Sequence, residues 1–178
     1  MASFISAGHH LKDSGAVGNG YKENELTTEF RNLVVSHCLK KGMNVITDKD
    51  TETLGQYLSR IQTGSGSVVI EFHFDASVNK TATGTTALVG DDADRLDKSF
   101  AKELVDCTSK TLGIKNRGVQ SEAMSHRGKL GLMREQGTVA LLELGFISNK
   151  SDMESYQKNK KILAELIANI IYKYENLA

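Results

Sequence analysis

Four ionisable side chains stand where predicted strands end or a predicted helix begins. His9 follows the first apolar run, His73 lies near the end of a central run, Glu143 ends the last run, and Glu23 opens the first long helix. The carboxyl ends of strands in open α/β sheets form the crevices in which ligands bind. Two histidines and one glutamate can hold catalytic zinc with a fourth position open, and a further carboxylate can act as general base and acid. We therefore predict a zinc hydrolase site in which Glu143 transfers protons.

Each of these side chains also has a purely structural interpretation. A carboxylate at a helix N-terminus, such as Glu23, is stabilised by the helix dipole. A single histidine at a strand end is often an ordinary hydrogen-bonded polar residue, and Glu143 could pair with a loop Arg or Lys. The combination favours the metal site, because zinc at an open site lowers the pKa of water to about 7 and polarises a carbonyl group.

The other histidines have different predicted places. His10 adjoins His9, and neighbouring residues of an extended segment point in opposite directions, so only one of the two easily faces the site. His37 falls on the apolar side of a predicted helix, which indicates the edge of the core. His126 lies in a long polar loop beside Arg127 and is a candidate substrate contact.

Segments of strand and helix periodicity alternate along the chain, which predicts an α/β domain. We expect a twisted, mostly parallel or mixed sheet of five or six strands flanked by helices. The expected strands cover residues 3–7, 43–47, 67–74, 85–89 and 138–143, and the expected helices cover residues 23–41, 51–61, 93–112 and 160–174. Residues 114–130 are predicted to be a long polar connection, a kind of segment that is usually functional or mobile.

Composition limits the class of protein. The chain has 178 residues, of which 39% are hydrophobic and 25% charged, and its formal net charge is zero. These values predict one globular domain over residues 1–178 and exclude a disordered chain or a coiled-coil rod. Neutral charge favours neither nucleic acid nor an acidic membrane as partner. No apolar run approaches the ~20 residues needed to cross a bilayer, and no signal peptide is visible. Cys38 and Cys107 fall in predicted helices without CxxC spacing, which indicates buried free thiols.

Four short motifs resemble those of the zinc-dependent N-acetylmuramoyl-L-alanine amidases of the third type. Residues 7–16, Ala-Gly-His-His-Leu-Lys-Asp-Ser-Gly-Ala, resemble the opening Gly-His followed by Asp-Pro-Gly-Ala. Glu23, with Leu26 behind it, is similar to the second ligand of that family. Residues 72–77 resemble its His-x-Asn-Ala strand end, and residues 142–149 match its Glu-x-Gly-Phe-x-Ser-Asn segment. The resemblance runs from the first strand to the last helix.

The resemblance implies one Zn2+ per chain, held by His9, Glu23 and His73, with Glu143 as the catalytic acid–base residue. Arg117 lies in a segment that resembles the border of the family's substrate groove, which makes it a candidate substrate-binding residue. The implied substrate is peptidoglycan, and the implied reaction is hydrolysis of the amide between the lactyl group of N-acetylmuramic acid and L-alanine. Within this interpretation the chain is a bare catalytic domain without a wall-binding module, and we expect a monomer.

Several residues depart from the family pattern. Ser14 replaces the proline of the opening motif, Asp75 replaces an asparagine after the third ligand, and Glu71 stands where a serine is common in bacterial autolysins. The implied zinc ligands are unaffected. The combination of Glu71 and His73 resembles phage-type members of the family.

Other functions are compatible with the same residues. A zinc peptidase or carboxypeptidase acting within the stem peptide could use the same ligands, and a wall-binding or regulatory domain could keep the fold without activity. A chain made in the cytoplasm without a signal peptide fits a phage endolysin, which reaches the wall after the host membrane is permeabilised. The alternative is a bacterial autolysin domain, secreted with a leader that lies outside this sequence.

Overall fold

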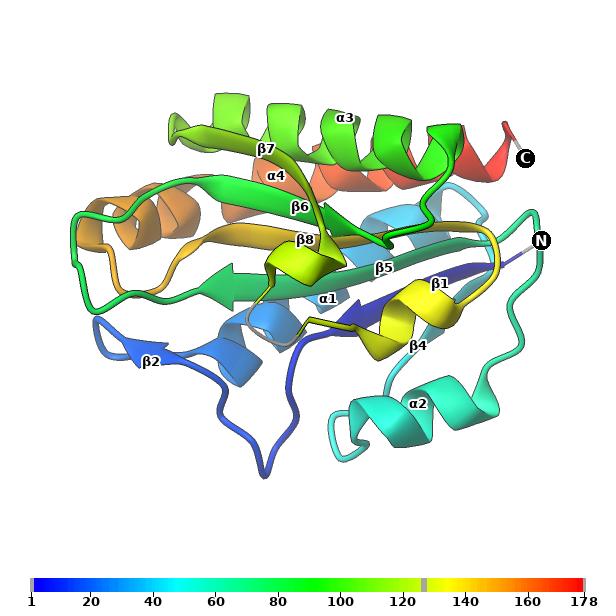
Figure 1. Ribbon diagram of the computed structural model, residues 1–178, viewed down its shortest axis with the longest axis horizontal. Helices are drawn as coiled ribbons and strands as arrows, with labels where there is room; N and C mark the ends of the chain where they lie inside the picture. Colours follow the sequence, from blue (N-terminus) through cyan, green and yellow to red (C-terminus); the bar gives the residue numbers. More distant parts are fainter. Residues whose placement is uncertain (1, 126–127, 178) are drawn as a thin grey trace.

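Six strands form one mixed sheet in the order β4-β1-β5-β8-β6-β7 (Figure 1). The computed structural model describes residues 2–125 and 128–177. The strands of the sheet are β1 (Ser3–Ala7), β4 (Val45–Thr47), β5 (Val68–Asp75), β6 (Thr85–Val89), β7 (Asn116–Ser121) and β8 (Thr138–Phe146). The helices are α1 (Glu23–Lys40), α2 (Leu54–Arg60), α3 (Arg95–Leu112) and α4 (Lys150–Glu175). A small hairpin, β2 (Val17–Gly18) and β3 (Tyr21–Lys22), and two 3₁₀ turns, η1 (Glu122–Met124) and η2 (Gly131–Arg134), complete the described elements.

The direction of the strands places the ends of β1, β5 and β8 at one edge of the sheet. β4, β1, β5 and β8 are parallel neighbours, whereas β6 runs antiparallel to β8 and β7 runs parallel to β6. β5 and β8 are almost entirely buried, as their nearly continuous apolar sequences predict for central strands covered on both faces. The residues that follow β1 and end β5 and β8 therefore meet at one edge.

The two faces of the sheet carry different cores. On one face the buried side chains of Ile70, Phe72 and Leu142 pack in a large cluster with α1, α3 and α4. On the other face Val69 and Leu141 belong to a smaller cluster that includes residues of α2 and η2. Because side chains alternate along a strand, Glu71 and His73 follow Val69 on the second face, and Glu143 follows Leu141 there. The smaller apolar core thus gives way to ionisable groups toward the carboxyl ends of the strands.

The predicted fold class is confirmed, and two local predictions are wrong. The region 114–130, expected to be a polar connection, contains the edge strand β7 and the turn η1. The sequence of β7, Asn-Arg-Gly-Val-Gln-Ser, has one large apolar residue. A half-exposed edge strand of this kind lacks an alternating apolar pattern, so the strand was not predicted. The last helix begins at Lys150, ten residues earlier than expected. Its first turns bury Met153 and Tyr156 among polar residues, while the Asn149 side chain caps the helix by accepting the N–H of Asp152.

Within the described ranges, no helix is both long and apolar enough to cross a membrane. Cys38 of α1 is buried, Cys107 of α3 is half-buried, and both are free thiols. The prediction of free thiols is therefore confirmed, although Cys107 is less buried than expected.

Candidate active site

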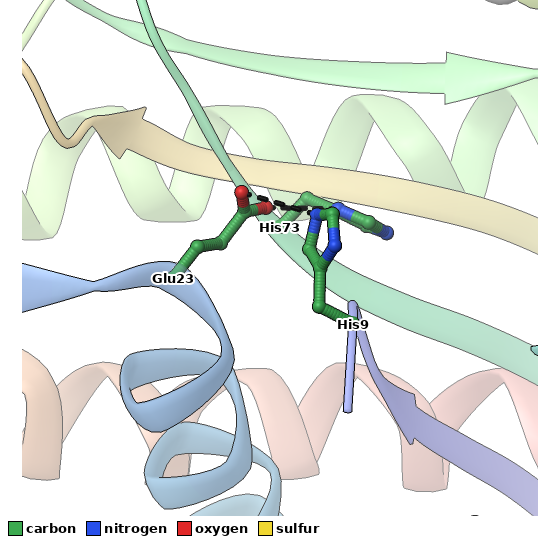
Figure 2. Close-up of side chains that lie close together, drawn as sticks. All are labelled: His9, Glu23 and His73. Carbon is green, nitrogen blue, oxygen red and sulfur yellow. Dashed lines mark hydrogen bonds and ion pairs between the residues drawn. The ribbon is translucent and has the colours of Figure 1, made fainter. Parts of the chain in front are cut away.

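His9, Glu23 and His73 converge at the sheet edge from three separate elements. His9 follows β1, Glu23 is the first residue of α1, and His73 lies near the end of β5 (Figure 2). Each offers one ligand atom, and the three atoms lie within 4.8 Å of one another. Residues 64 positions apart in the sequence are thereby brought into one cluster.

Glu23 lies between the two imidazole rings. Its Oε2 is 3.2 Å from Nε2 of His9, and its Oε1 is 3.0 Å from Nδ1 of His73. The same carboxylate accepts the backbone N–H groups of Ala16 at 2.9 Å and Phe74 at 3.0 Å. These backbone contacts fix the carboxylate from the loop before β2 and from strand β5.

A second carboxylate lies behind each imidazole. Nδ1 of His9 is 2.8 Å from Oδ2 of Asp13, and Nε2 of His73 is 2.8 Å from Oε1 of Glu71. Glu71 also accepts the hydroxyl of Ser6 at 3.2 Å. A carboxylate on the outer nitrogen of a ligating histidine orients the ring and selects the tautomer whose inner nitrogen can bind metal.

Two glycines make room for this packing. A Cβ at Gly8 would lie 2.3 Å from Cε1 of His73, and a Cβ at Gly15 would lie 2.6 Å from Oε2 of Glu23. His9 itself has a φ of 69°, a backbone conformation that side-chain-bearing residues seldom adopt. Such strain is maintained by the surrounding structure and is concentrated at functional sites.

The charges of the cluster stabilise one another. Burial opposes ionisation of Glu23, but hydrogen bonds from His73 and His9 outweigh it and lower the pKa of Glu23. Burial likewise opposes protonation of His9 and His73, yet the neighbouring carboxylates raise the pKa of both rings. Metal binding must displace these protons, so occupancy of the site depends on pH.

Glu143 lies on the neighbouring strand. It stands opposite His73 in the parallel register of β5 and β8, and it lines the same crevice as the three clustered residues. Its Oε2 is buried and has no hydrogen-bond partner among the described residues. Burial raises the pKa of Glu143 to about 8, against the opposing charge of His73.

The donor set fits a zinc ion. Two imidazole nitrogens and one carboxylate are a set found at catalytic zinc sites. The outer carboxylates of Asp13 and Glu71 supply the supporting contacts that such ligands use. The unpaired Oε2 of Glu143 leaves a carboxylate available for proton transfer rather than for pairing with a loop cation.

Besides this cluster, the crevice is lined by a set of apolar side chains, called the apolar wall below, and by polar residues of β7. The apolar wall is formed by Leu54, Leu88, Met124, Leu130, Leu132 and Leu141. Arg117 and Gln120 of β7 line the polar side. Nη1 of Arg117 is 3.5 Å from Oδ2 of Asp75, and the guanidinium carbon is 4.8 Å from the centre of the Phe146 ring. Arg117 thus faces the crevice, where sequence reasoning expected a substrate-binding residue.

Some residues of the site escaped sequence reasoning. The pairing of Glu71 with His73 follows from strand periodicity, because residues two apart lie on one face, but the contact of Asp13 with the His9 ring depends on a loop conformation. Thr86 of β6 also lines the crevice, and no motif indicated it. His126 lies outside the described residues, so its predicted substrate contact stays a prediction.

The comparisons with known proteins point to one family. The Amidase_3 family model, described as N-acetylmuramoyl-L-alanine amidase, matches residues 4–173. The chain belongs to this family. It is therefore an N-acetylmuramoyl-L-alanine amidase, an enzyme that hydrolyses peptidoglycan.

Individual relatives of this amidase are distant in sequence. A probable autolysin, PH, of Staphylococcus aureus is 27% identical over 197 residues, which cover 94% of this chain and 37% of the relative. A putative N-acetylmuramoyl-L-alanine amidase from Neisseria meningitidis has 26% identity and a TM-score of 0.77, with 97% and 94% of the two chains covered. The catalytic domain of the CD27L endolysin targeting Clostridia Difficile has 22% identity and a TM-score of 0.74, with 97% of each chain covered. The amidase thus spans little more than a third of the autolysin.

Proposed function

We propose that this amidase holds one zinc ion with His9, Glu23 and His73 and uses Glu143 as its acid–base residue. The proposed reaction is hydrolysis of the amide that joins the lactyl group of N-acetylmuramic acid to L-alanine. The observation that carries the proposal is the unpaired Oε2 of Glu143 in the crevice that the three-residue cluster lines. A buried carboxylate without a partner costs free energy, and active sites are where such groups are kept.

Glu143 transfers the protons of the proposed hydrolysis, at a site where zinc would activate the carbonyl and the water. Zinc, when bound, would polarise the lactyl carbonyl and make a water molecule easier to deprotonate. Glu143 takes a proton from the attacking water and returns it to the nitrogen of L-alanine as the C–N bond breaks. Burial raises the pKa of Glu143 in the metal-free protein. In the reaction the carboxylate must be ionised to take the proton from water, and only then can it donate that proton to the leaving amine.

Other residues position the reacting groups. Asp13 and Glu71 hold the two imidazole rings in place through their outer nitrogens. Arg117 presents a guanidinium to the crevice, which suits a carboxylate of the stem peptide. The apolar wall excludes water from the reacting amide and strengthens these polar contacts.

A Glu143→Gln variant tests the assignment of the acid–base group. We expect release of stem peptides from purified sacculi to fall by about 10²- to 10⁴-fold, because that is the usual contribution of general acid–base catalysis. Zinc content should stay at the parent level, since Glu143 is not a proposed ligand. A His73→Ala variant provides the contrast, because it should lose the metal as well as the activity. A zinc-loaded Glu143→Gln protein that works at the parent rate contradicts the assignment.

Product analysis tests which bond is cut. Mass spectrometry of fragments from defined peptidoglycans should find free L-alanine amino termini and intact glycan chains, and a chelator should abolish their release. New amino termini within the stem peptide would instead identify a zinc peptidase or carboxypeptidase. The same digests show which peptidoglycan chemotype is preferred.

We further propose that this amidase acts as a phage endolysin. The proposal is supported by the similarity to the CD27L endolysin domain over nearly the whole of both chains and by the pairing of Glu71 with His73. The chain expressed inside a susceptible bacterium should cause lysis only when the membrane is permeabilised. An enzyme that cleaves purified sacculi but spares permeabilised cells would contradict this role and favour an autolysin domain.

A further inference from the structure

Thr86 carries a buried hydroxyl with no hydrogen-bond partner among the residues that the structure describes. It is 3% exposed, lies in the sheet on β6, and lines the crevice. The preceding residue, Thr85, is fully buried but donates its hydroxyl proton to the backbone oxygen of Glu143 at 2.6 Å. Two adjacent threonines of one strand thus differ in whether their hydroxyl is satisfied. An unsatisfied buried hydroxyl costs free energy, so its retention calls for a reason.

The register of the sheet places Thr86 beside Glu143. The two residues stand directly opposite in the antiparallel ladder of β6 and β8. Side chains at such positions share one face of the sheet, with Cβ atoms roughly 4.5–5.5 Å apart. Oε2 of Glu143 likewise has no hydrogen-bond partner within the described part of the chain. At that Cβ spacing, one polar group of a ligand can contact both side chains.

Unpaired polar atoms are concentrated in this crevice. Within residues 2–125 and 128–177, five buried side-chain oxygens lack a partner: Ser3 Oγ, Asn24 Oδ1, Thr86 Oγ1, Ser125 Oγ and Glu143 Oε2. The last three all line the crevice. A ligand that enters the crevice can therefore satisfy several groups that the protein leaves open.

The order of strands decides which part of a substrate reaches Thr86. His73 on β5, Glu143 on β8 and Thr86 on β6 lie on three successive strands. The carbonyl end of the scissile amide belongs at the His73 end, where the metal would polarise it. The nitrogen end, which Glu143 must protonate, then lies toward Thr86. An amide nitrogen carries one N–H donor, and a threonine hydroxyl can accept one hydrogen bond while donating another.

We infer that Thr86 is a catalytic residue of the proposed amide hydrolysis, whose hydroxyl accepts the N–H of the scissile amide while the nitrogen of that amide lies against Glu143. This contact gives the Thr86 hydroxyl a partner and holds the leaving nitrogen beside Glu143, its proton donor. No proton is transferred through the hydroxyl. The inference rests on the proposed role of Glu143 and on cleavage of the lactyl–alanine bond.

An ester substrate separates this role from a structural one. A muramoyl depsipeptide in which the hydroxyl of L-lactate replaces the amino group of L-alanine has the same carbonyl but lacks the N–H. We expect Thr86→Val to lower kcat/KM on the amide by roughly 3- to 10-fold, the worth of one neutral hydrogen bond. Its kcat/KM on the ester should equal that of the parent enzyme. Thr86→Ser keeps the hydroxyl and should retain near-parent rates on both substrates.

Thr108→Val is the matched control, because Thr108 is a fully buried threonine of α3 that does not line the crevice. It should leave the ratio of amide to ester rates unchanged. The melting temperature of Thr86→Val should stay at or above the parent value, since the lost hydroxyl has no partner in the part of the chain that the structure describes. Equal losses on amide and ester, or no loss on the amide, would overturn the inference. Glu143→Gln distinguishes this from failure of the proposed function, because that variant should lose activity on both substrates whatever the role of Thr86.

Discussion

The two sides of the crevice differ in how completely their polar atoms are paired. On the cluster side, each imidazole nitrogen of His9 and His73 lies within 3.2 Å of a carboxylate oxygen. On the other side, the side chains of Glu143 and Thr86 each keep a buried oxygen with no partner among the described residues. The first side is assembled by the fold itself. We propose that the second side is completed when a substrate supplies the missing partners.

The difference reflects what each side has to do. A metal site gains affinity when its ligands are already oriented, so saturated hydrogen bonding is an advantage there. A group that must hold and release a proton during the reaction works best if its strongest contacts form with the reacting atoms. The free energy lost to unpaired oxygens near Glu143 is offset elsewhere, in the large core around α1, α3 and α4.

The largest effect is expected from Gly8→Ala, which would disrupt the cluster side of the crevice, where the nitrogens of His9 and His73 are all paired. The new Cβ would lie within 2.6 Å of three ring atoms of His73, so the ring must move. We expect loss of both zinc binding and activity, measured by metal analysis and by release of stem peptides. Gly55→Ala is the control, because Gly55 has open space around it and lies in α2. It should be neutral or stabilise the protein by up to about 1 kcal/mol. Retention of zinc by Gly8→Ala would contradict the packing described for His73.

The next largest effect is expected from the outer carboxylates. Glu71→Gln should weaken zinc binding by about 10- to 100-fold, as loss of a supporting contact to a ligand usually does. Asp13→Asn should have a smaller effect, because the Asp13 side chain is 53% exposed whereas that of Glu71 is 5% exposed. Competition with a chelator of known affinity measures both variants. If both variants bound zinc as tightly as the parent protein, the metal site would not depend on the contacts of Glu71 and Asp13.

The pH dependence of the free energy of unfolding tests the histidine side and the Glu143 side of the crevice together. In the metal-free protein His9 and His73 have raised pKa values, so the folded state holds more protons than the unfolded state above about pH 6.5. Glu143, with a pKa of about 8 against 4.5, acts in the same direction between those values. Stability must therefore fall as pH rises, by up to about 1.4 kcal/mol per pH unit and per group. The lowered pKa of Glu23 acts oppositely, removing stability as pH falls below about 4.5.

Denaturant titrations of chelator-treated protein between pH 6 and pH 8 measure this slope. Glu143→Gln removes one of the three contributions and should flatten it. Zinc binding requires neutral imidazoles, so the stabilisation by added zinc should grow over the same range. A metal-free protein that gains stability with rising pH would refute the assigned directions of the pKa shifts.

The smallest effect is expected from the adjacent threonines of β6. Thr85→Val removes the hydrogen bond to the Glu143 backbone and should lower the free energy of unfolding by about 1 kcal/mol. Thr86→Val removes a hydroxyl that has no partner among residues 2–125 and 128–177, and it should leave stability unchanged or raise it. Thermal unfolding of the two single variants compares them directly. Equal destabilisation would mean that the Thr86 hydroxyl has a partner in solution.

Sequence periodicity predicted much of the fold but little of the polar edge. The strand at Ser3–Ala7 and the strand at Thr85–Val89 were expected at their observed bounds, because short apolar runs between turn residues define them. β7 was missed, because an exposed edge strand needs no apolar pattern. His9, Glu23 and His73 were predicted to meet because strand ends and helix starts gather at one edge of a sheet. Glu143 was expected to end its strand, but β8 continues for three more residues to Phe146.

The sequence by itself predicted that His9, Glu23, His73 and Glu143 would gather at one edge of the sheet, since strand ends and helix starts meet there. Only the tertiary structure decided which polar atoms are paired there. Pairing depends on distances of about 3 Å between side chains that are far apart in the chain, and no local pattern encodes such distances. The contrast between the saturated histidines and the unpaired oxygens of Glu143 and Thr86 is therefore a property of the folded sheet alone.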